Sequence, residues 1–179
     1  MRIVIDMQGI QAKMENLENN AYTTSFVQAI VRNRGTHDVI LVLSDQYPST
    51  ISFIRIIFRE MLSLDKIRVW HVPQSVEVYQ KTSNICTQVF ELIREAFLIS
   101  LQPDIIHFAN FDADHVNTTV AGIGALRNQT PITIMFPQWG KSDQVRISSW
   151  IDHQSDILAK AVAWIIPSSD ADTVQKITT

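Results

Sequence analysis

The chain has little of the material from which recognisable sites are usually built. It contains one cysteine, Cys86, and five glycines among 179 residues. A lone cysteine excludes a Cys-x-x-Cys motif, and its helical spacing with Val89, Phe90 and Ile93 predicts a buried thiol rather than a nucleophile. The histidines are scattered, without a His-x-x-x-His pair. We therefore expect no metal ion and no cofactor.

The chain also lacks a strong excess of positive or negative charge, and it lacks long apolar runs. The net charge is -3 and the basic residues are spread along the chain, so nucleic acid is not expected as a partner. The longest apolar stretches are interrupted by Arg55 and Arg59, or by Arg94 and Glu95, so none could span a bilayer. Because the first strand is expected to begin at once, leaving no room for a signal peptide, we expect a cytoplasmic protein.

Short apolar runs rich in β-branched residues are present, separated by longer stretches with helical spacing. They are Arg2–Asp6, Val39–Ser44, Ile67–Val72, Asp104–Phe108, Pro131–Phe136 and Ala163–Pro167. This alternation predicts an α/β fold with a doubly wound, parallel, Rossmann-like sheet in a three-layer sandwich. Right-handed crossovers predict about six strands in the order 3-2-1-4-5-6. Residues 1–179 are expected to form a single domain.

The stretches between the strands predict helices of unequal clarity. Helical spacing is found in Ala21–Arg32, Ile51–Leu62, Ile85–Leu101, Thr118–Arg127, Ile147–Lys160 and Ser169–Ile177, whereas Met7–Asn20 is polar and is expected to form a connection. The strongest pattern is that of Ile85–Leu101. Its expected core face consists of Ile85, Val89, Leu92, Ile93, Ala96 and Phe97, and its expected solvent face of Gln88, Glu91 and Glu95.

Ligands of such sheets bind beyond the carboxyl ends of the strands, so candidate residues are sought there. Asp6 ends the first run, and an acid there could hold a metal or attack phosphate. However, Asp6-Met7-Gln8 lacks the second carboxylate that a phosphatase of the haloacid-dehalogenase type requires. Gly9 alone does not make the Gly-x-Gly-x-x-Gly fingerprint of dinucleotide binding.

Other polar residues fall near the same strand ends. Asp112, Asp114 and His115 follow the fourth run and could form an acid/base cluster, although a solvated loop explains them better. His71 and His107 lie within strand runs. We predict that both are buried and hydrogen-bonded, because a sheet covered on both faces has no wet side.

Several segments, taken in order, resemble the amino-terminal half of bacterial glycosyltransferases of the group-one, family-four type. The resemblance covers nearly the whole chain. It rests on Met1-Arg-Ile-Val-Ile-Asp-Met-Gln-Gly9, on Ala29 through Leu41, on Leu92 through Leu98 followed by Pro103 through Phe108, and on Trp150 through Ala163 followed by Ile166 through Val174. Each segment alone is only moderately specific, and their order carries the resemblance.

The resemblance implies the acceptor-side domain of a two-domain, GT-B glycosyltransferase. Such an enzyme moves a sugar from a nucleotide-sugar to a cell-surface polysaccharide or glycolipid, and its carboxy-terminal domain, which binds the donor, is not found in this chain. The implied acceptor contacts are Gln8, Gly9, Asn110 and Phe111, which follow the first and fourth strands; the catalytic residues stay unassigned. The resemblance also allows peripheral membrane association of the full protein.

The chain departs from the family pattern in two places. Met14–Asn20 replaces a glycine-rich, arginine-bearing loop, and Met135-Phe136 stands where the family carries His-Asp. Two hypotheses therefore stay open: an acceptor-side domain that is inactive by itself, or a degenerate domain that kept the fold and serves as a scaffold or interaction module.

Overall fold

The computed structural model describes residues 1–15, 21–72, 84–109, 130–135 and 161–165. The elements in chain order are β1 (Arg2–Asp6), α1 (Gln8–Glu15), α2 (Ala21–Arg32), β2 (Asp38–Ser44), α3 (Pro48–Phe58), the 3-10 turn η1 (Leu64–Lys66), β3 (Ile67–Trp70), α5 (Asn84–Ser100), β4 (Ile105–Phe108), β5 (Ile132–Met135) and β6 (Ala161–Ile165). The predicted strands are all present, with bounds that differ by no more than two residues.

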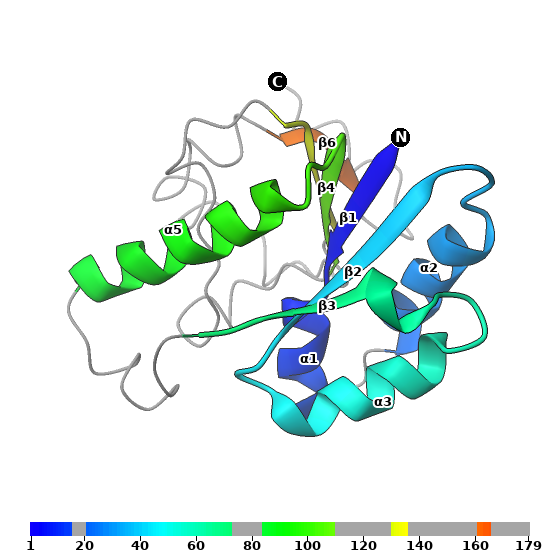
Figure 1. Cartoon of the computed structure of the whole chain (residues 1–179), viewed down its shortest axis with the longest axis horizontal. Helices are drawn as coiled ribbons and strands as arrows, with labels where there is room; N and C mark the ends of the chain where they lie inside the picture. Colours follow the sequence, from blue (N-terminus) through cyan, green and yellow to red (C-terminus); the bar gives the residue numbers. More distant parts are fainter. Residues whose placement is uncertain (16–20, 73–83, 110–129, 136–160, 166–179) are drawn as a thin grey trace, which may run out of the picture.

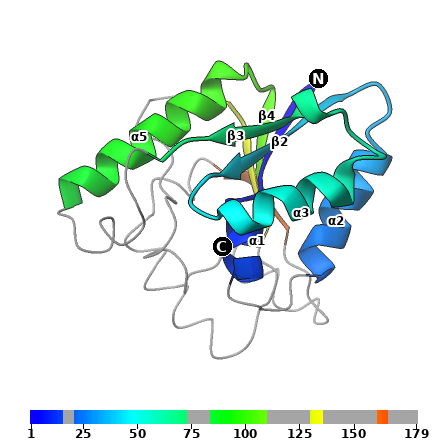
Figure 2. The same ribbon diagram turned by 60° about the horizontal axis from the view of Figure 1, so that its bottom comes forward.

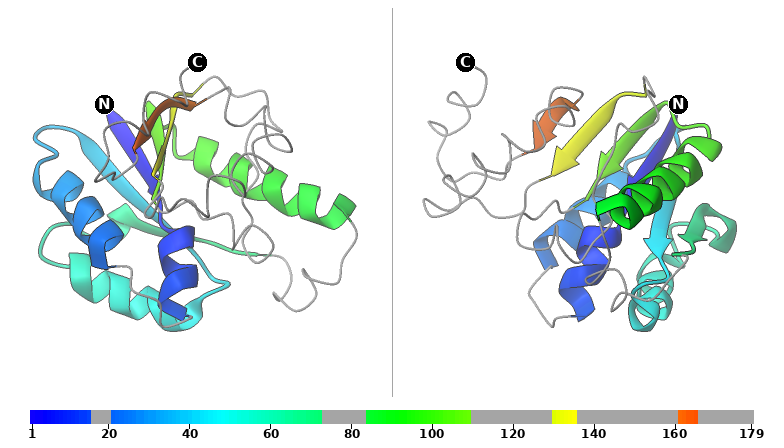
Figure 3. Two further views of the ribbon diagram at one scale, coloured as in Figure 1. Left: turned by 180° about the vertical axis from the view of Figure 1, so that it is seen from behind. Right: turned by 90° about the vertical axis from the view of Figure 1, so that its left-hand side faces the viewer.

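The strands form one parallel sheet in the order β3-β2-β1-β4-β5-β6, which confirms the predicted doubly wound topology. The helices α1, α2 and α3 cover one face of the sheet and α5 covers the other (Figures 1 and 2). The right-hand view of Figure 3 shows the strands side by side, with α5 crossing in front of them. The strand order reverses beside β1, because β2 and β3 lie on one side of it and β4, β5 and β6 on the other; open sheets of this type bind ligands at such a switch point.

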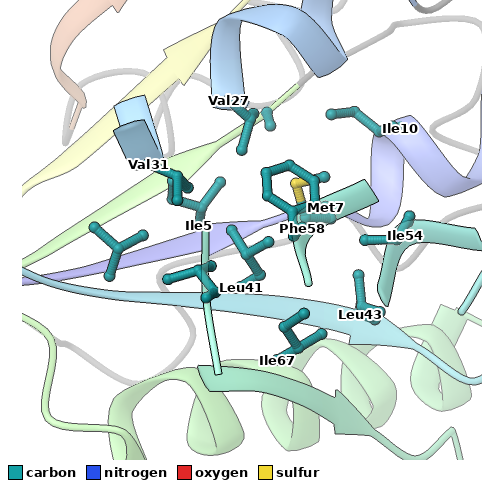
Figure 4. Packing of buried hydrophobic residues seen from close by; sticks show 13 residues of the cluster. Ile5, Met7, Ile10, Val27, Val31, Leu41, Leu43, Ile54, Phe58 and Ile67 are labelled. Atoms are coloured by element: carbon teal, nitrogen blue, oxygen red, sulfur yellow. The ribbon is translucent and has the colours of Figure 1, made fainter. Parts of the chain in front are cut away.

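The main core lies between the sheet and the helices α1 to α3 (Figure 4). Because side chains alternate along a strand, Ile5 of β1 points into this core while Val4 and Asp6 belong to the α5 face. Val31 of α2 and Phe58 of α3 meet Ile5 in the same cluster, and all are fully buried. Pro48 begins α3, a position at which its missing N–H costs nothing.

Charged side chains join the amino ends of β1 and β2 to the last residue of η1, just before β3. Asp38 accepts hydrogen bonds from Arg2 Nε at 3.0 Å and from Lys66 Nζ at 2.6 Å. The hydrogen bond from Lys66 is the main reason why the pKa of Asp38 lies below its usual value. The amino edge of the sheet is therefore held together by ion pairs.

Two helical expectations were wrong. Residues 8–15 form a helix instead of a connection, because Met7, Ile10 and Met14 recur at helical spacing and pack on the core despite their polar neighbours. In addition, α5 is turned about its axis relative to the prediction. It buries Phe90, Arg94, Glu95 and Leu98, and it exposes Val89, Leu92 and Ile93 by 36 to 44%.

Three predicted helices, Thr118–Arg127, Ile147–Lys160 and Ser169–Ile177, lie outside the described residues. The same is true of the side chain of Cys86, although its backbone belongs to α5. Within the described part of the chain, no helix is long and apolar enough to cross a membrane.

Candidate functional site

The carboxyl edge of the sheet carries two acidic residues in different surroundings. Asp6 is the last residue of β1, and Asp45 directly follows β2. Each carboxylate is held by a basic side chain from another element, Arg94 of α5 in the first case and His71 after β3 in the second. The two pairs define what the described part of this edge can do chemically.

Asp6 is buried and fully engaged. Its Oδ2 accepts hydrogen bonds from Arg94 Nε at 3.0 Å and Nη2 at 2.6 Å, and its Oδ1 accepts one from the backbone N–H of Gln8 at 2.9 Å. The Asp6 and Arg94 side chains are only 2% and 3% exposed. The carboxylate thus ties α1 and α5 to the end of β1, and this geometry leaves it no role as a nucleophile or metal ligand.

Arg94 makes a second contact at the switch point of the sheet. Its guanidinium carbon lies 5.2 Å from the ring centre of Phe108, the last residue of β4. Phe108 is in register with Asp6, so both residues present their side chains to the α5 face. A cation held over an aromatic face and paired with a carboxylate is well satisfied in a dry site. The ends of β1 and β4 are therefore closed by internal contacts.

Two of the predicted acceptor contacts are described next to this pair. Gln8 and Gly9 form the first turn of α1, and the Gln8 side chain is buried. Asn110 and Phe111 lie outside the described residues. The assignment of these four residues to the acceptor stays a prediction, and the expected cluster of Asp112, Asp114 and His115 also lies outside the described ranges.

His71 was predicted to be a core residue, and this was wrong. β3 ends one residue earlier, at Trp70, and the His71 side chain is 81% exposed. Its hydrogen bond is confirmed, because Nδ1 lies 2.8 Å from Asp45 Oδ2. A carboxylate can only accept, so the hydrogen in this contact belongs to Nδ1. In the neutral imidazole, Nε2 then carries a lone pair that faces solvent.

Asp45 is fixed by backbone groups at and just beyond the end of β3. Its N–H donates to the carbonyl of Trp70 at 3.2 Å, and its Oδ1 accepts the N–H of Val72 at 2.8 Å. The register of β2 and β3 pairs Ser44 with Trp70, so the next residues, Asp45 and His71, meet directly beyond the sheet. The sequence carried no signal of this pair, because 26 residues separate its members.

A buried glutamine anchors the strand end below Asp45. The Gln11 side chain accepts the Ser44 N–H at 2.7 Å, and its amide donates to the Ser44 carbonyl at 3.0 Å and to Thr50 Oγ1 at 2.9 Å. Gln11 and Ser44 are both fully buried. The start of the β2–α3 connection is thus pinned to α1 by side-chain hydrogen bonds, which makes the Asp45 backbone a rigid support.

His107 of β4 behaves as predicted for a core histidine. It is buried, its Nδ1 lies 2.8 Å from Thr133 Oγ1 of β5, and its ring centre lies 5.9 Å from that of Phe26 of α2. Burial lowers the pKa of His107 to about 4, because the charged imidazolium would lose its hydration. His107 is therefore neutral at physiological pH.

Among the residues that the structure describes, no group of three or more His, Cys, Asp or Glu side chains is arranged to hold a metal ion. The described edge instead offers one closed ion pair and one exposed imidazole with a fixed orientation. The parallel sheet and its strand order define a Rossmann-like α/β domain.

Comparison with known proteins finds a distant similarity to one of them. The chain is 21% identical over 126 residues to the serotype-specific mannosyltransferase WbdA of Escherichia coli. The match covers 70% of this chain but only 15% of that protein, so the chain corresponds to a small part of its relative. No protein-family model and no solved structure matches the chain. The similarity supports a distant relationship to a glycosyltransferase.

Proposed function

We propose that this chain is the acceptor-side Rossmann-like domain of a GT-B glycosyltransferase of the group-one, family-four type. The observation that carries the proposal is the similarity to a mannosyltransferase over 70% of the chain. The parallel sheet of order 3-2-1-4-5-6 is consistent with it, because that fold supplies a ligand crevice at its carboxyl edge. Fold alone would not suffice, since many functions share it.

The proposed reaction transfers a sugar from a nucleotide-sugar to a cell-surface polysaccharide or glycolipid. This domain would hold the acceptor at the carboxyl edge, with Gln8, Gly9, Asn110 and Phe111 as contacts, and a second domain would supply the donor and the charge stabilisation of the leaving phosphate. We further propose that the enzyme acts in the cytoplasm, in peripheral contact with the membrane that carries its acceptor.

A transfer assay on the product of the complete reading frame tests the proposal. The assay follows labelled mannose from a nucleotide-activated donor into glycolipid or polysaccharide extracted from the source cells. We expect transfer by the complete product and none above background by residues 1–179 alone. A complete product that transfers no sugar from any nucleotide-sugar in a panel would overturn the proposal.

A second candidate is a degenerate scaffold domain. The observation that favours it is the closed state of the β1 end, where Asp6 and Arg94 satisfy each other instead of facing a ligand. In that case the complete product would transfer nothing, yet it would copurify with, and increase the activity of, an active glycosyltransferase from the same cells. That result would replace the first candidate with the second.

A further inference from the structure

The exposed imidazole beyond β3 has features that an ordinary surface ion pair lacks. Most exposed pairs join two long, mobile side chains and contribute little energy. Here the carboxylate follows a buried strand, is tied to the backbone of Trp70 and Val72, and lies next to Ser44, which Gln11 pins from below. Asp45 orients the His71 ring through one hydrogen bond, and hydrogen bonds to the backbone hold Asp45 in turn.

The chemistry of the pair is specific. Asp45 is 32% exposed and uses its Oδ2 to hold Nδ1–H of His71, while the ring itself is 81% exposed. An imidazole whose Nδ1–H is fixed by a carboxylate presents Nε2 as an oriented acceptor, because the other tautomer would lose this hydrogen bond. Such a group suits a hydroxyl, which can donate to Nε2 and be polarised by it.

We propose that Asp45 and His71 form a hydroxyl-recognition site for a carbohydrate, in which His71 Nε2 accepts a hydrogen bond from a sugar hydroxyl and Asp45 is the positioning residue. The carbohydrate class rests on the proposed function. The place of the site rests on geometry, because both residues lie just beyond the carboxyl ends of adjacent parallel strands, on the edge where open α/β sheets bind ligands.

The chain offers a matched set of variants. In His71→Asn, the side-chain amide can still donate to Asp45 from near the place of Nδ1, but nothing replaces Nε2. In His71→Gln, the longer amide reaches the place of Nε2 and can accept there, while the contact with Asp45 is lost. His37→Asn changes an exposed histidine that precedes β2, at the opposite edge of the sheet, and serves as the control.

The test is a titration of the labelled 179-residue chain with α-linked mannotriose, followed by nuclear magnetic resonance. We expect the sugar to shift the amide signals of residues 45, 71 and 72 and the Nε2 signal of His71. His71→Asn should weaken binding about tenfold, which corresponds to one lost hydrogen bond. His71→Gln should recover part of the loss, and His37→Asn should bind as the wild type does.

Asp45→Asn tests the positioning role separately. An amide in place of the carboxylate no longer selects Nδ1–H, so the nitrogen signals of His71 should change from one tautomer to a mixture. Mannotriose binding should weaken while the rest of the spectrum keeps its dispersion. An unchanged tautomer in this variant would contradict the assigned role of Asp45.

Either of two titration results overturns the inference: no shift at residues 45, 71 and 72 with mannotriose, or equal binding by the wild type and His71→Asn. Neither result decides the proposed function, which the transfer assay measures independently. Transfer by the complete product at an undiminished rate with His71→Asn would leave the glycosyltransferase standing and remove the hydroxyl site. Binding at His71 without any transfer would keep the hydroxyl site and remove the proposed glycosyltransferase.

Discussion

Two acids at the carboxyl edge of one sheet have opposite surroundings. Asp6, at the end of β1, is 2% exposed and is held by Arg94 from the opposite helical layer, while Asp45, after β2, is 32% exposed and holds the ring of His71 in solvent. Both residues lie where a hydrophobic run ends, so the sequence alone does not distinguish their surroundings. The difference shows that an acid at a strand end becomes either structural or available to a ligand according to the partner that reaches it.

The largest effect is expected at the closed end. Arg94→Ala leaves the Asp6 carboxylate buried without its counter-charge, and breaking a buried pair from one side costs about 3–5 kcal/mol. Urea unfolding followed by circular dichroism measures the loss. Arg94→Lys provides a second variant in case the first does not fold, and it should retain part of the stability because a lysine cannot donate twice in the arginine geometry.

Arg59→Ala is the matched control for that experiment. Arg59 Nη2 lies 3.8 Å from Glu60 Oε1, and both side chains are mostly exposed. Exposed pairs of this kind contribute about 0–1 kcal/mol, so its loss should be barely measurable. Equal destabilisation by the two arginine variants would show that the buried Asp6–Arg94 pair contributes no more to stability than an exposed pair does.

The next largest effect on stability is expected at Gln11, whose side chain holds Ser44, the residue before Asp45. Gln11→Leu keeps the volume of the side chain but leaves the buried Ser44 N–H without the Gln11 acceptor, and the Ser44 carbonyl and Thr50 without its donor. We expect a loss of about 2–3 kcal/mol in urea unfolding, since buried polar groups without partners cost about 1–3 kcal/mol each. Gln28→Leu, at a half-buried position of α2, should change stability by less than about 0.5 kcal/mol.

The buried His107 makes the stability of the folded chain depend on pH. The folded pKa of His107 is about 4, and that of an unfolded histidine is about 6.5, so the unfolded chain binds more protons between these values. Stability is therefore fully present above about pH 6.5 and is lost as the pH falls toward 4. The expected loss between pH 7 and pH 5 is about 2 kcal/mol.

The measurement compares urea unfolding of wild type and His107→Asn at pH 7 and pH 5. The asparagine can keep the contact with Thr133 and does not titrate, so the variant should show a pH dependence smaller by the contribution of His107. Carboxylates elsewhere titrate in both proteins and cancel in the difference. Identical pH dependence in the two proteins would mean that His107 is already charged or exposed in the fold.

The smallest effect on stability is expected at the exposed Asp45–His71 pair. His71→Asn should change the free energy of unfolding by less than about 0.5 kcal/mol, because the ring is exposed and the hydrogen bond to Asp45 is retained. Thermal unfolding at neutral pH checks this. A loss above about 2 kcal/mol would show that His71 supports the fold, and its role at the ligand edge would then need another explanation.

The sequence was sufficient to predict the sheet but not the partners of its strand ends. Runs such as Arg2–Asp6 predict strands because β-branched residues buried on both faces need no information from elsewhere. In contrast, the rotation of α5 depends on Arg94 reaching Asp6, which lies 88 residues away in the sequence. Hydrophobic periodicity predicted the wrong core face for α5, because it treats every charged residue as exposed and so cannot anticipate a buried ion pair.

The candidate site was predictable in place but not in composition. The rule for open sheets correctly directed attention to the carboxyl edge. His71 was assigned to the core because the run Ile67–Val72 is continuous, although the ladder ends at Trp70. Its pairing with Asp45 follows from strand register, which the spacing of residues along the chain does not reveal.

The helix α5 exposes three apolar side chains and buries two charged ones, and this affects which substitutions it tolerates. Its apolar side chains Val89, Leu92 and Ile93 are outside, whereas Arg94 and Glu95 are inside. A scan of substitutions along α5 should therefore depart from hydropathy at these positions, with polar replacements accepted at Val89, Leu92 and Ile93 and hydrophobic ones rejected at Arg94, while the buried Phe90 and Leu98 should still require apolar side chains. Variation among relatives of this domain is expected to follow the same profile.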